Sequence, residues 1–236
     1  MIRAFAFDLD GTLTQHRTPL GDTNRRILEK LAEKYTLLMV GAGSCMRIFK
    51  QMGGFPIDII GNYGMQYAKS ANGELTLIRD SVVPCADRDA VEKNITMLRE
   101  KYGFTEFAGD NVEFHDSGCI TFPILGTQAV QADKLAFDPD RKKRRAFYGE
   151  VCELFSDYNV FVGGSSSFDM APKPFNKYYA LDLWCRENGF GHDEVVFSGD
   201  DYGIGGNDES VYHSDFRFNC VDDYTRLEEY LAPWLK

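Results

Sequence analysis

The chain opens with Ile2–Phe7 (IRAFAF), a short and mostly apolar run, and continues directly into Asp8–Thr14 (DLDGTLT). An apolar run of this length that stops at acidic residues and a glycine is typical of a buried strand with an abrupt end. Thr36–Val40 (TLLMV) is a second such run, closed by Gly41–Ser44, and a third lies near Ile57–Ile60. Helical patterns separate these runs, so the sequence predicts a parallel, helix-covered sheet.

The strand and helix alternation is interrupted in the middle of the chain. A different unit begins near Pro84, with expected helices over about Ala90–Lys101 and Pro139–Phe155 and expected strands near Val112–His115, Cys119–Leu125, Asn159–Val162 and Phe168–Ala171. Alternation resumes with a helix over about Lys177–Glu187, strands at Glu194–Ser198 and Arg217–Asn219, and a last helix at Asp222–Leu231. We therefore expect an α/β, Rossmann-like core of residues 1–82 and 172–236 and an inserted α+β cap of residues 83–171.

Composition and charge exclude several classes of protein. The formal net charge is −10, whereas a protein that grips a nucleic-acid backbone usually carries a basic surface. No stretch approaches the roughly 20 apolar residues of a membrane helix, and the apolar start is too short for a signal peptide. The six cysteines form no CxxC pair, which argues against a metal site or a disulfide framework made by them. We expect a cytoplasmic protein with neither nucleic acid nor a membrane as partner.

Polar side chains follow several strands of the predicted sheet. Asp8 and Asp10 end the first strand, Ser44 follows the second, and Asp200-Asp201 follow a later one. The carboxyl ends of parallel strands meet at one edge of a sheet, where ligands bind. Four carboxylates and one hydroxyl are therefore expected to gather at this edge.

Such a cluster of carboxylates needs a cation. Two unit charges about 4 Å apart repel by about 4 kcal/mol at an effective dielectric constant of 20. Mg²⁺ prefers one or two carboxylates together with phosphate oxygens, and it lets an anionic carboxylate approach an anionic phosphate. Lys177, at the start of a predicted helix, and Ser44 can hold further phosphate oxygens. The pattern favours magnesium-dependent chemistry on a small phosphorylated molecule.

The Asp8–Thr14 segment after an apolar strand resembles the first signature of the haloacid-dehalogenase-like (HAD) hydrolases, and their other signatures follow in order. The resemblance implies that Asp8 is a nucleophile that forms an aspartyl-phosphate. It implies that Asp10 is first the general acid and then the general base. It further implies that the phosphoryl group is held by Ser44 and Lys177. The implied Mg²⁺ ligands are Asp8, the backbone carbonyl of Asp10, and Asp200, with Asp201 or Asp208 assisting from the outer shell.

Within that superfamily, nearly the whole chain resembles the eukaryotic-type phosphomannomutases. The segments that carry this resemblance are Gly163–Asp169 (GGSSSFD), Pro172–Leu181 (PKPFNKYYAL) and Gly199–Asp208 (GDDYGIGGND). Arg17 matches a family arginine near the substrate, and Ser167 and Asp169 match cap residues that hold the sugar. Members of that family form dimers through the cap, and the resemblance implies by analogy a homodimer for this chain.

The chain departs from the family in the cap. The family grips a second phosphate there with several arginines, but this chain has Glu113–Gly118 (EFHDSG) and Ile124–Thr127 (ILGT) where two of them belong. Lys134 stands at a third position, and His115 is the other candidate. Lysine does not replace the bidentate contacts of arginine. The departures favour a phosphatase over a mutase.

The preferred interpretation is therefore a Mg²⁺-dependent phosphatase that hydrolyses a small phosphorylated metabolite, in particular a sugar phosphate, with Arg17, Lys134, Ser167 and Asp169 contacting the substrate. A hexose-phosphate mutase of the phosphomannomutase type is the alternative. A silent sugar-phosphate-binding protein and a dehalogenase are more remote alternatives. The basic run Arg141–Arg145 (RKKRR) is interpreted as a solvated helix face rather than a phosphate grip.

Overall fold

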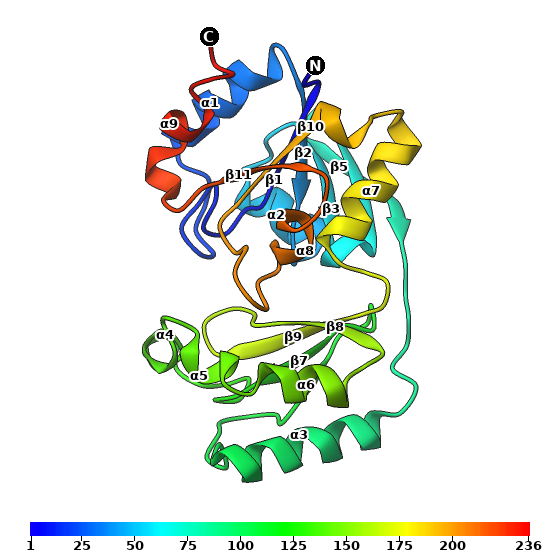
Figure 1. Cartoon of the computed structure of the whole chain (residues 1–236), viewed down its shortest axis with the longest axis vertical. Coiled ribbons are helices and arrows are strands. Elements are labelled where there is room, and N and C mark those ends of the chain that lie inside the picture. Colours follow the sequence, from blue (N-terminus) through cyan, green and yellow to red (C-terminus); the bar gives the residue numbers. More distant parts are fainter. The chain divides into compact units, whose positions relative to one another are not determined.

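The computed structural model describes all residues, Met1–Lys236, which form two compact units (Figure 1). One contains Met1–Ser81, Phe175–Gly203 and Asp208–Lys236, and the other contains Val82–Pro174 and Ile204–Asn207. We call them the core unit and the inserted unit. The two units are compact, but a domain is also able to fold on its own. The domain limits expected from the sequence therefore stay a prediction. None of the helices is both long and apolar enough to span a bilayer.

The core unit is built on a seven-stranded sheet with the strand order β11-β10-β1-β2-β3-β4-β5. The strands are β1 (Ala4–Phe7), β2 (Thr36–Val40), β3 (Asp58–Gly61), β4 (Gln66–Ala71), β5 (Glu74–Asp80), β10 (Val195–Gly199) and β11 (Arg217–Cys220). The first five in spatial order, from β11 to β3, run parallel, and β4 and β5 add an antiparallel hairpin. The predicted fold class, a mostly parallel α/β sheet, is confirmed.

Helices cover both faces of this sheet because the strands are apolar on both sides. Phe5 and Phe7 of β1 pack with α1 (Asp22–Ala32), α2 (Cys45–Gln51) and α9 (Leu227–Leu231). Ala4 and Ala6, the alternate residues of the same strand, pack with α7 (Lys177–Asn188) and α8 (Glu209–Tyr212). Strand order reverses at β1, whose parallel neighbours are β10 and β2. This reversal is the place where open α/β sheets bind their ligands.

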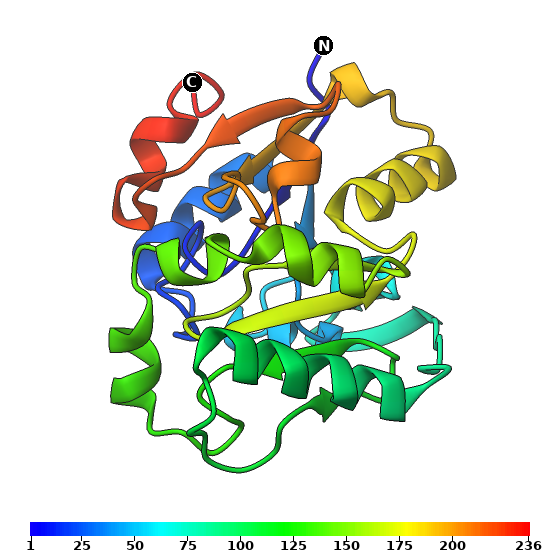
Figure 2. The ribbon, with the colours of Figure 1, turned by 60° about the horizontal axis from the view of Figure 1, so that its bottom comes forward.

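The inserted unit is an antiparallel sheet with helices on one face, as Figure 2 shows for α3 and α6. Its sheet has the order β6-β7-β9-β8. The elements are α3 (Arg88–Tyr102), β6 (Glu113–Phe114), β7 (Ile120–Pro123), α4 (Gln131–Phe137), α5 (Lys142–Arg145), α6 (Tyr148–Leu154), β8 (Tyr158–Phe161) and β9 (Ser167–Pro172). Phe122 and Phe168 face the helices, so Thr121, Ser167 and Asp169 lie on the other face of the sheet.

Two helix predictions were wrong in extent. The single helix expected over 139–155 is two short helices, α5 and α6, separated by Ala146 and Phe147. The last helix, expected at 222–231, is a 3₁₀ turn at Tyr224–Arg226 followed by α9. The side chain of Asp223 accepts a hydrogen bond from Thr225 N, which caps the turn rather than a longer helix.

Candidate active site

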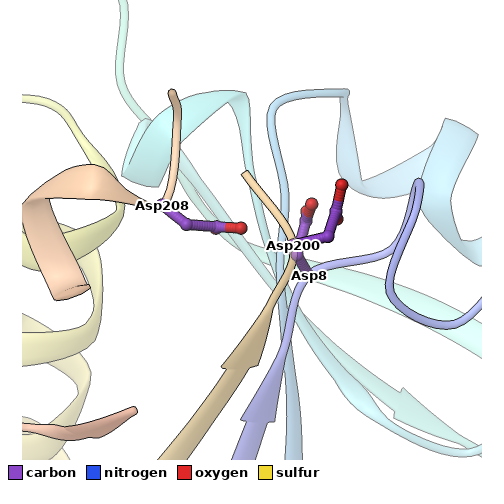
Figure 3. Close-up of side chains that lie close together, drawn as sticks. All are labelled: Asp8, Asp200 and Asp208. Atoms are coloured by element: carbon purple, nitrogen blue, oxygen red, sulfur yellow. The ribbon is translucent and has the colours of Figure 1, made fainter. Parts of the chain in front are cut away.

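Three carboxylates converge at the carboxyl ends of two neighbouring parallel strands. Asp8 follows β1 and Asp200 follows β10, and the backbone N–H of Asp8 donates to Ser198 O at 2.9 Å, which keeps the two strand ends in register. Asp208 immediately precedes α8 and points toward them (Figure 3). Carboxylate oxygens of Asp8, Asp200 and Asp208 all lie within 4.8 Å of one another.

Lys177 is the cation that this cluster already contains. Its Nζ lies 2.7 Å from Asp8 Oδ1 and 2.7 Å from Asp208 Oδ1, and its side chain is 0% exposed. The second oxygen of Asp208 accepts the backbone N–H of Asp201 at 3.0 Å. Burial lowers the pKa of Lys177, but the charges of Asp208 and Asp8 outweigh it, so the pKa lies above its ordinary value. Lys177 is therefore a charged lysine between two carboxylates.

One lysine does not neutralise three carboxylates. Burial is the main cause that raises the pKa of Asp8 well above its ordinary value, and the charges of Asp208 and Asp200 add to it. Burial, together with the charge of Asp208, likewise raises the pKa of Asp200 to about 7. Thr12 Oγ1 donates to Asp200 Oδ1 at 2.8 Å and opposes this rise only in part. Buried, mutually repelling oxygen donors fit a hard divalent cation such as Mg²⁺.

The side chains of this cluster differ in part from the Mg²⁺ ligands expected from the sequence. Asp8 and Asp200 lie in it as predicted, but its third side chain is Asp208, which was expected only in the outer shell. The side chain of Asp10 is not part of the trio. Its expected contribution was the backbone carbonyl, and that role stays a prediction. Asp208 lies seven residues beyond Asp201, and the loop between them folds back so that Asp208 N donates to Asp201 O. The resemblance of Gly199–Asp208 indicated this segment, but it did not distinguish an inner from an outer position for Asp208.

A pH dependence of stability follows from Asp200. In an unfolded chain its pKa is close to 4, whereas in the metal-free folded protein it is about 7. The contribution of this group to stability is therefore fully present below about pH 4 and is lost as the pH rises through 7. We expect the thermal midpoint of the metal-free protein to fall by about 5 °C between pH 5 and pH 8.

Millimolar Mg²⁺ should remove this fall, because an ion bound to the cluster holds the carboxylates ionised. Thermal denaturation with and without Mg²⁺ measures both effects. Asp200→Asn should make the metal-free profile less steep, with the raised pKa of Asp8 leaving part of the fall in place, while Asp133→Asn, on an exposed position of α4, should leave the profile unchanged. A wild-type profile that is flat without metal would count against the raised pKa.

Asp10 lies apart from the three carboxylates and is bound by other groups. Gln51 Nε2 and the backbone N–H of Arg17 donate to its Oδ1 at 2.6 and 2.7 Å. Arg47 Nη1 lies 3.4 Å from Oδ2, and His16 Nδ1 lies 3.9 Å from it. Burial raises the pKa of Asp10, but these hydrogen bonds and charges bring it below its ordinary value. Asp10 is therefore a carboxylate in the free protein.

Arg17 contacts this carboxylate through its backbone, and Ser44 caps the helix that carries Arg47. Ser44 is the N-cap of α2, and its Oγ accepts the backbone N–H of Arg47 at 3.3 Å. Arg17 has a backbone φ of 57°, a left-handed conformation unusual for a residue with a side chain. That conformation directs its N–H to Asp10, so its backbone has a role that the sequence did not indicate. The roles of Ser44 and of the Arg17 side chain toward a substrate stay predictions.

The predicted substrate residues of the inserted unit lie on two elements. Ser167 and Asp169 belong to β9, and Ser167 Oγ lies 3.4 Å from Asp169 Oδ1. Thr121 on β7 donates to the same oxygen at 3.2 Å, and His115 Nε2 is hydrogen-bonded to Thr121 Oγ1 at 3.0 Å. Lys134 lies instead on α4, where its Nζ donates to Thr127 O at 3.1 Å. The sequence missed Thr121, although strand alternation places it on the face of Asp169.

The basic run Arg141–Arg145 is not the uniform solvated face that we expected. Arg144 is fully buried and forms a salt bridge of 2.9 Å with the buried Asp138. Its Nη1 donates to the carbonyls of Gly163 and Ser167 at 2.6 and 2.9 Å. Arg144 thus braces the loop that leads into β9. The exposed Lys142 and Lys143 keep the expected solvated character.

The family model and the similar proteins of known name agree on one family. A family model described as "Eukaryotic phosphomannomutase" matches residues 24–222. The phosphomannomutase of Saccharomyces cerevisiae is 28% identical over 221 residues, covering 87% of this chain and 83% of that protein. The phosphomannomutase of Encephalitozoon cuniculi is 26% identical over 258 residues, covering 96% and 93%. These names favour the mutase alternative more than the phosphatase that we preferred from the sequence.

Solved structures of similar fold include a nucleotidase and a protein described among phosphatases. IMP-bound IMP-nucleotidase of Plasmodium falciparum has a TM-score of 0.65 at 14% identity, covering 99% of this chain and 68% of that one. BT1666 of Bacteroides thetaiotaomicron, described among phosphatases of the HAD superfamily, has a TM-score of 0.61 at 18% identity, covering 98% and 95%. At such identities the likeness shows the HAD-like fold alone, and it confirms the predicted core with a separate antiparallel cap sheet.

Proposed function

Since this chain belongs to the eukaryotic phosphomannomutase family of the HAD superfamily, we propose that it transfers a phosphoryl group from a small phosphorylated metabolite to Asp8 and then to water. In this proposal it is a magnesium-dependent phosphatase, and its substrate is a sugar phosphate. The observation that supports phosphoryl transfer most strongly is the buried group of Asp8, Asp200, Asp208 and Lys177 at the strand-order reversal.

Asp8 is the nucleophile in this proposal. Lys177 binds Asp8 Oδ1, which leaves Oδ2 to attack phosphorus while the bond from phosphorus to the leaving oxygen breaks. Mg²⁺ held by Asp8 and Asp200 would neutralise negative charge on these carboxylates and on the phosphoryl oxygens. Asp208 holds Lys177 in place from the other side. Replacement of either partner would therefore disturb the orientation of the nucleophile.

Asp10 is the proton carrier in this proposal. It gives a proton to the leaving oxygen in the first step and takes one from the attacking water in the second. Its lowered pKa in the free protein suits the second step. For the first step it must be protonated, and an anionic phosphate group close to it raises its pKa in that direction.

The arginines of the inserted unit support water rather than a second sugar site as the acceptor. A mutase must bind a phosphate at each end of the sugar, and arginine is the residue best suited to the second one. Arg99 and Arg144 are buried and donate to backbone carbonyls. Arg145 donates to Ile204 O, and Arg88 lies over the ring of Phe114. Four of the unit's arginines thus have partners within the unit.

A hexose-phosphate mutase is the second candidate, and the names of the curated relatives favour it. The two candidates differ in a direct assay. A phosphate-release screen over phosphorylated metabolites with Mg²⁺ should be run beside an interconversion assay on mannose and glucose phosphates, with and without a sugar bisphosphate. We expect release to be faster than interconversion. Interconversion faster than release, stimulated by the bisphosphate, would establish the mutase instead.

The same proposal includes a cytoplasmic location and a small molecule, rather than nucleic acid, as the partner. The net charge of −10 supports the second point. A homodimer stays a prediction by analogy, which light scattering coupled to size-exclusion chromatography can test.

A further inference from the structure

Two side chains of α2, Arg47 and Gln51, contact Asp10, although the chemistry proposed above uses neither of them. Gln51 Nε2 donates to Asp10 Oδ1 at 2.6 Å, across 41 residues of sequence, and the same atom lies 3.1 Å from Thr14 Oγ1. Thr14 is fully buried in the segment that follows Asp10. Gln51 therefore ties the carboxylate of Asp10 to the fixed end of its own loop.

Arg47 determines which end of the Gln51 amide faces Asp10. The two residues lie one turn apart on α2, and Arg47 Nη1 donates to Gln51 Oε1 at 3.3 Å. The oxygen of the amide is thus directed to the guanidinium, and the NH₂ group is directed to the carboxylate. The opposite orientation would set an amide oxygen against a carboxylate oxygen and the guanidinium against an NH₂ group. The arrangement fixes a donor on Asp10 Oδ1.

Other contacts hold this end of α2 in place. The backbone N–H of Leu20 donates to Gln51 O at 2.9 Å, and Met52 and Ile48 beside it are fully buried. Because this turn of α2 is well anchored, the Gln51 side chain can hold Asp10 in a fixed position. Proton transfer requires such accuracy, since a displacement of about 1 Å can lower the rate of the reaction about 100-fold.

We propose that Gln51 is a positioning residue that holds the Asp10 carboxylate where it exchanges a proton with the leaving oxygen, and that Arg47 orients the Gln51 amide for this purpose. The proposal rests on the proposed function, because it takes Asp10 to be the proton carrier. It concerns the placement of Asp10 and not its affinity for a proton.

The test compares substrates that differ in their need for a proton. The leaving group of an alkyl phosphate such as a sugar phosphate is a strongly basic alkoxide, which needs a proton from Asp10 as the P–O bond breaks. The leaving group of p-nitrophenyl phosphate is a stable phenolate, which does not need one. The comparison uses kcat/KM, which reports the steps up to formation of the aspartyl-phosphate and leaves out the hydrolysis step that both substrates share. Gln51→Ala should lower kcat/KM for the alkyl phosphate by about 30-fold and kcat/KM for p-nitrophenyl phosphate by less than about 3-fold. Gln51→Glu, which keeps the size but replaces the donor with a repelling oxygen, should show at least the same difference.

Controls separate this role from a structural one. Lys50→Ala, on the exposed neighbouring position of α2, should keep both activities, and thermal denaturation should show that the Gln51 variants remain folded. Asp10→Asn should reproduce the leaving-group pattern in kcat/KM, and adding Gln51→Ala to it should cause little further loss of kcat/KM. Equal losses of kcat/KM on both substrates, or no loss on either, would overturn the positioning role. Wild-type protein that turns over neither substrate would instead overturn the proposed function.

Discussion

Asp8→Asn is expected to lower turnover of every phosphorylated substrate by about 10⁴-fold or more, because the amide cannot attack phosphorus and no other carboxylate in the cluster is placed to replace it. Asp200 is bound by Thr12, and Asp208 is bound by Lys177 and by the backbone of Asp201. The measurement is phosphate release with Mg²⁺ at saturating substrate.

The same variant should remain folded. Asn is nearly the size of Asp, and Lys177 keeps its contact of 2.7 Å with Asp208. Removing one of three crowded carboxylates also relieves repulsion, so the thermal midpoint of the metal-free variant should be no lower than that of the wild type. If folded Asp8→Asn protein kept more than about one tenth of wild-type turnover, the assignment of Asp8 as nucleophile would be wrong.

Lys177→Met is expected to have the largest effect on stability. Methionine fills a similar volume but leaves Asp8 and Asp208 buried without their cation, and breaking a buried ion pair by removing one partner costs about 3–5 kcal/mol. Turnover should also be abolished, because nothing then orients Asp8. Chemical denaturation of the metal-free protein at pH 8 measures the change in the free energy of unfolding.

Two further conditions check the cause of this loss. Lowering the pH to 5 or adding Mg²⁺ should recover part of the stability, since either one reduces the uncompensated charge on the carboxylates. Lys142→Met removes a lysine whose partner, Asp140, lies on the surface, and it should leave stability unchanged. A Lys177→Met protein as stable as the Lys142→Met control at pH 8 would contradict the view that Lys177 compensates buried charge.

Much of the core unit could be predicted because its apolar strands, the helical patterns between them and the acidic residues at the strand ends all indicate the same parallel sheet. Two apolar strands, β1 and β10, are each followed by an aspartate, Asp8 and Asp200. Because parallel strands end at one edge of a sheet, this pattern predicts both the parallel pairing and the place of the site. Lys177 was also predictable as a residue at the start of a helix that follows the insert. The structure adds that it is fully buried between two carboxylates.

The parts that could not be predicted depend on contacts between distant residues. Gln51 looks like an ordinary last residue of a short helix until the fold brings it to Asp10. Arg144 sits in a run of five basic residues, and its contacts with the buried Asp138 and with the carbonyls of the loop at 163–167 distinguish it from the exposed Lys142 and Lys143. The helix α4 was missed because its first residues carry no capping side chain, and Val130 precedes it.

The most direct test is a search for phosphate on the enzyme during turnover. Wild-type protein is mixed with substrate carrying a radioactive phosphoryl group, quenched with acid within milliseconds and digested. The account predicts a burst of leaving group and a label on the peptide that contains Asp8, which disappears on a chase with unlabelled substrate and never forms in Asp8→Asn. A burst with the label on another residue, or full turnover with no labelled peptide at any time, would contradict it.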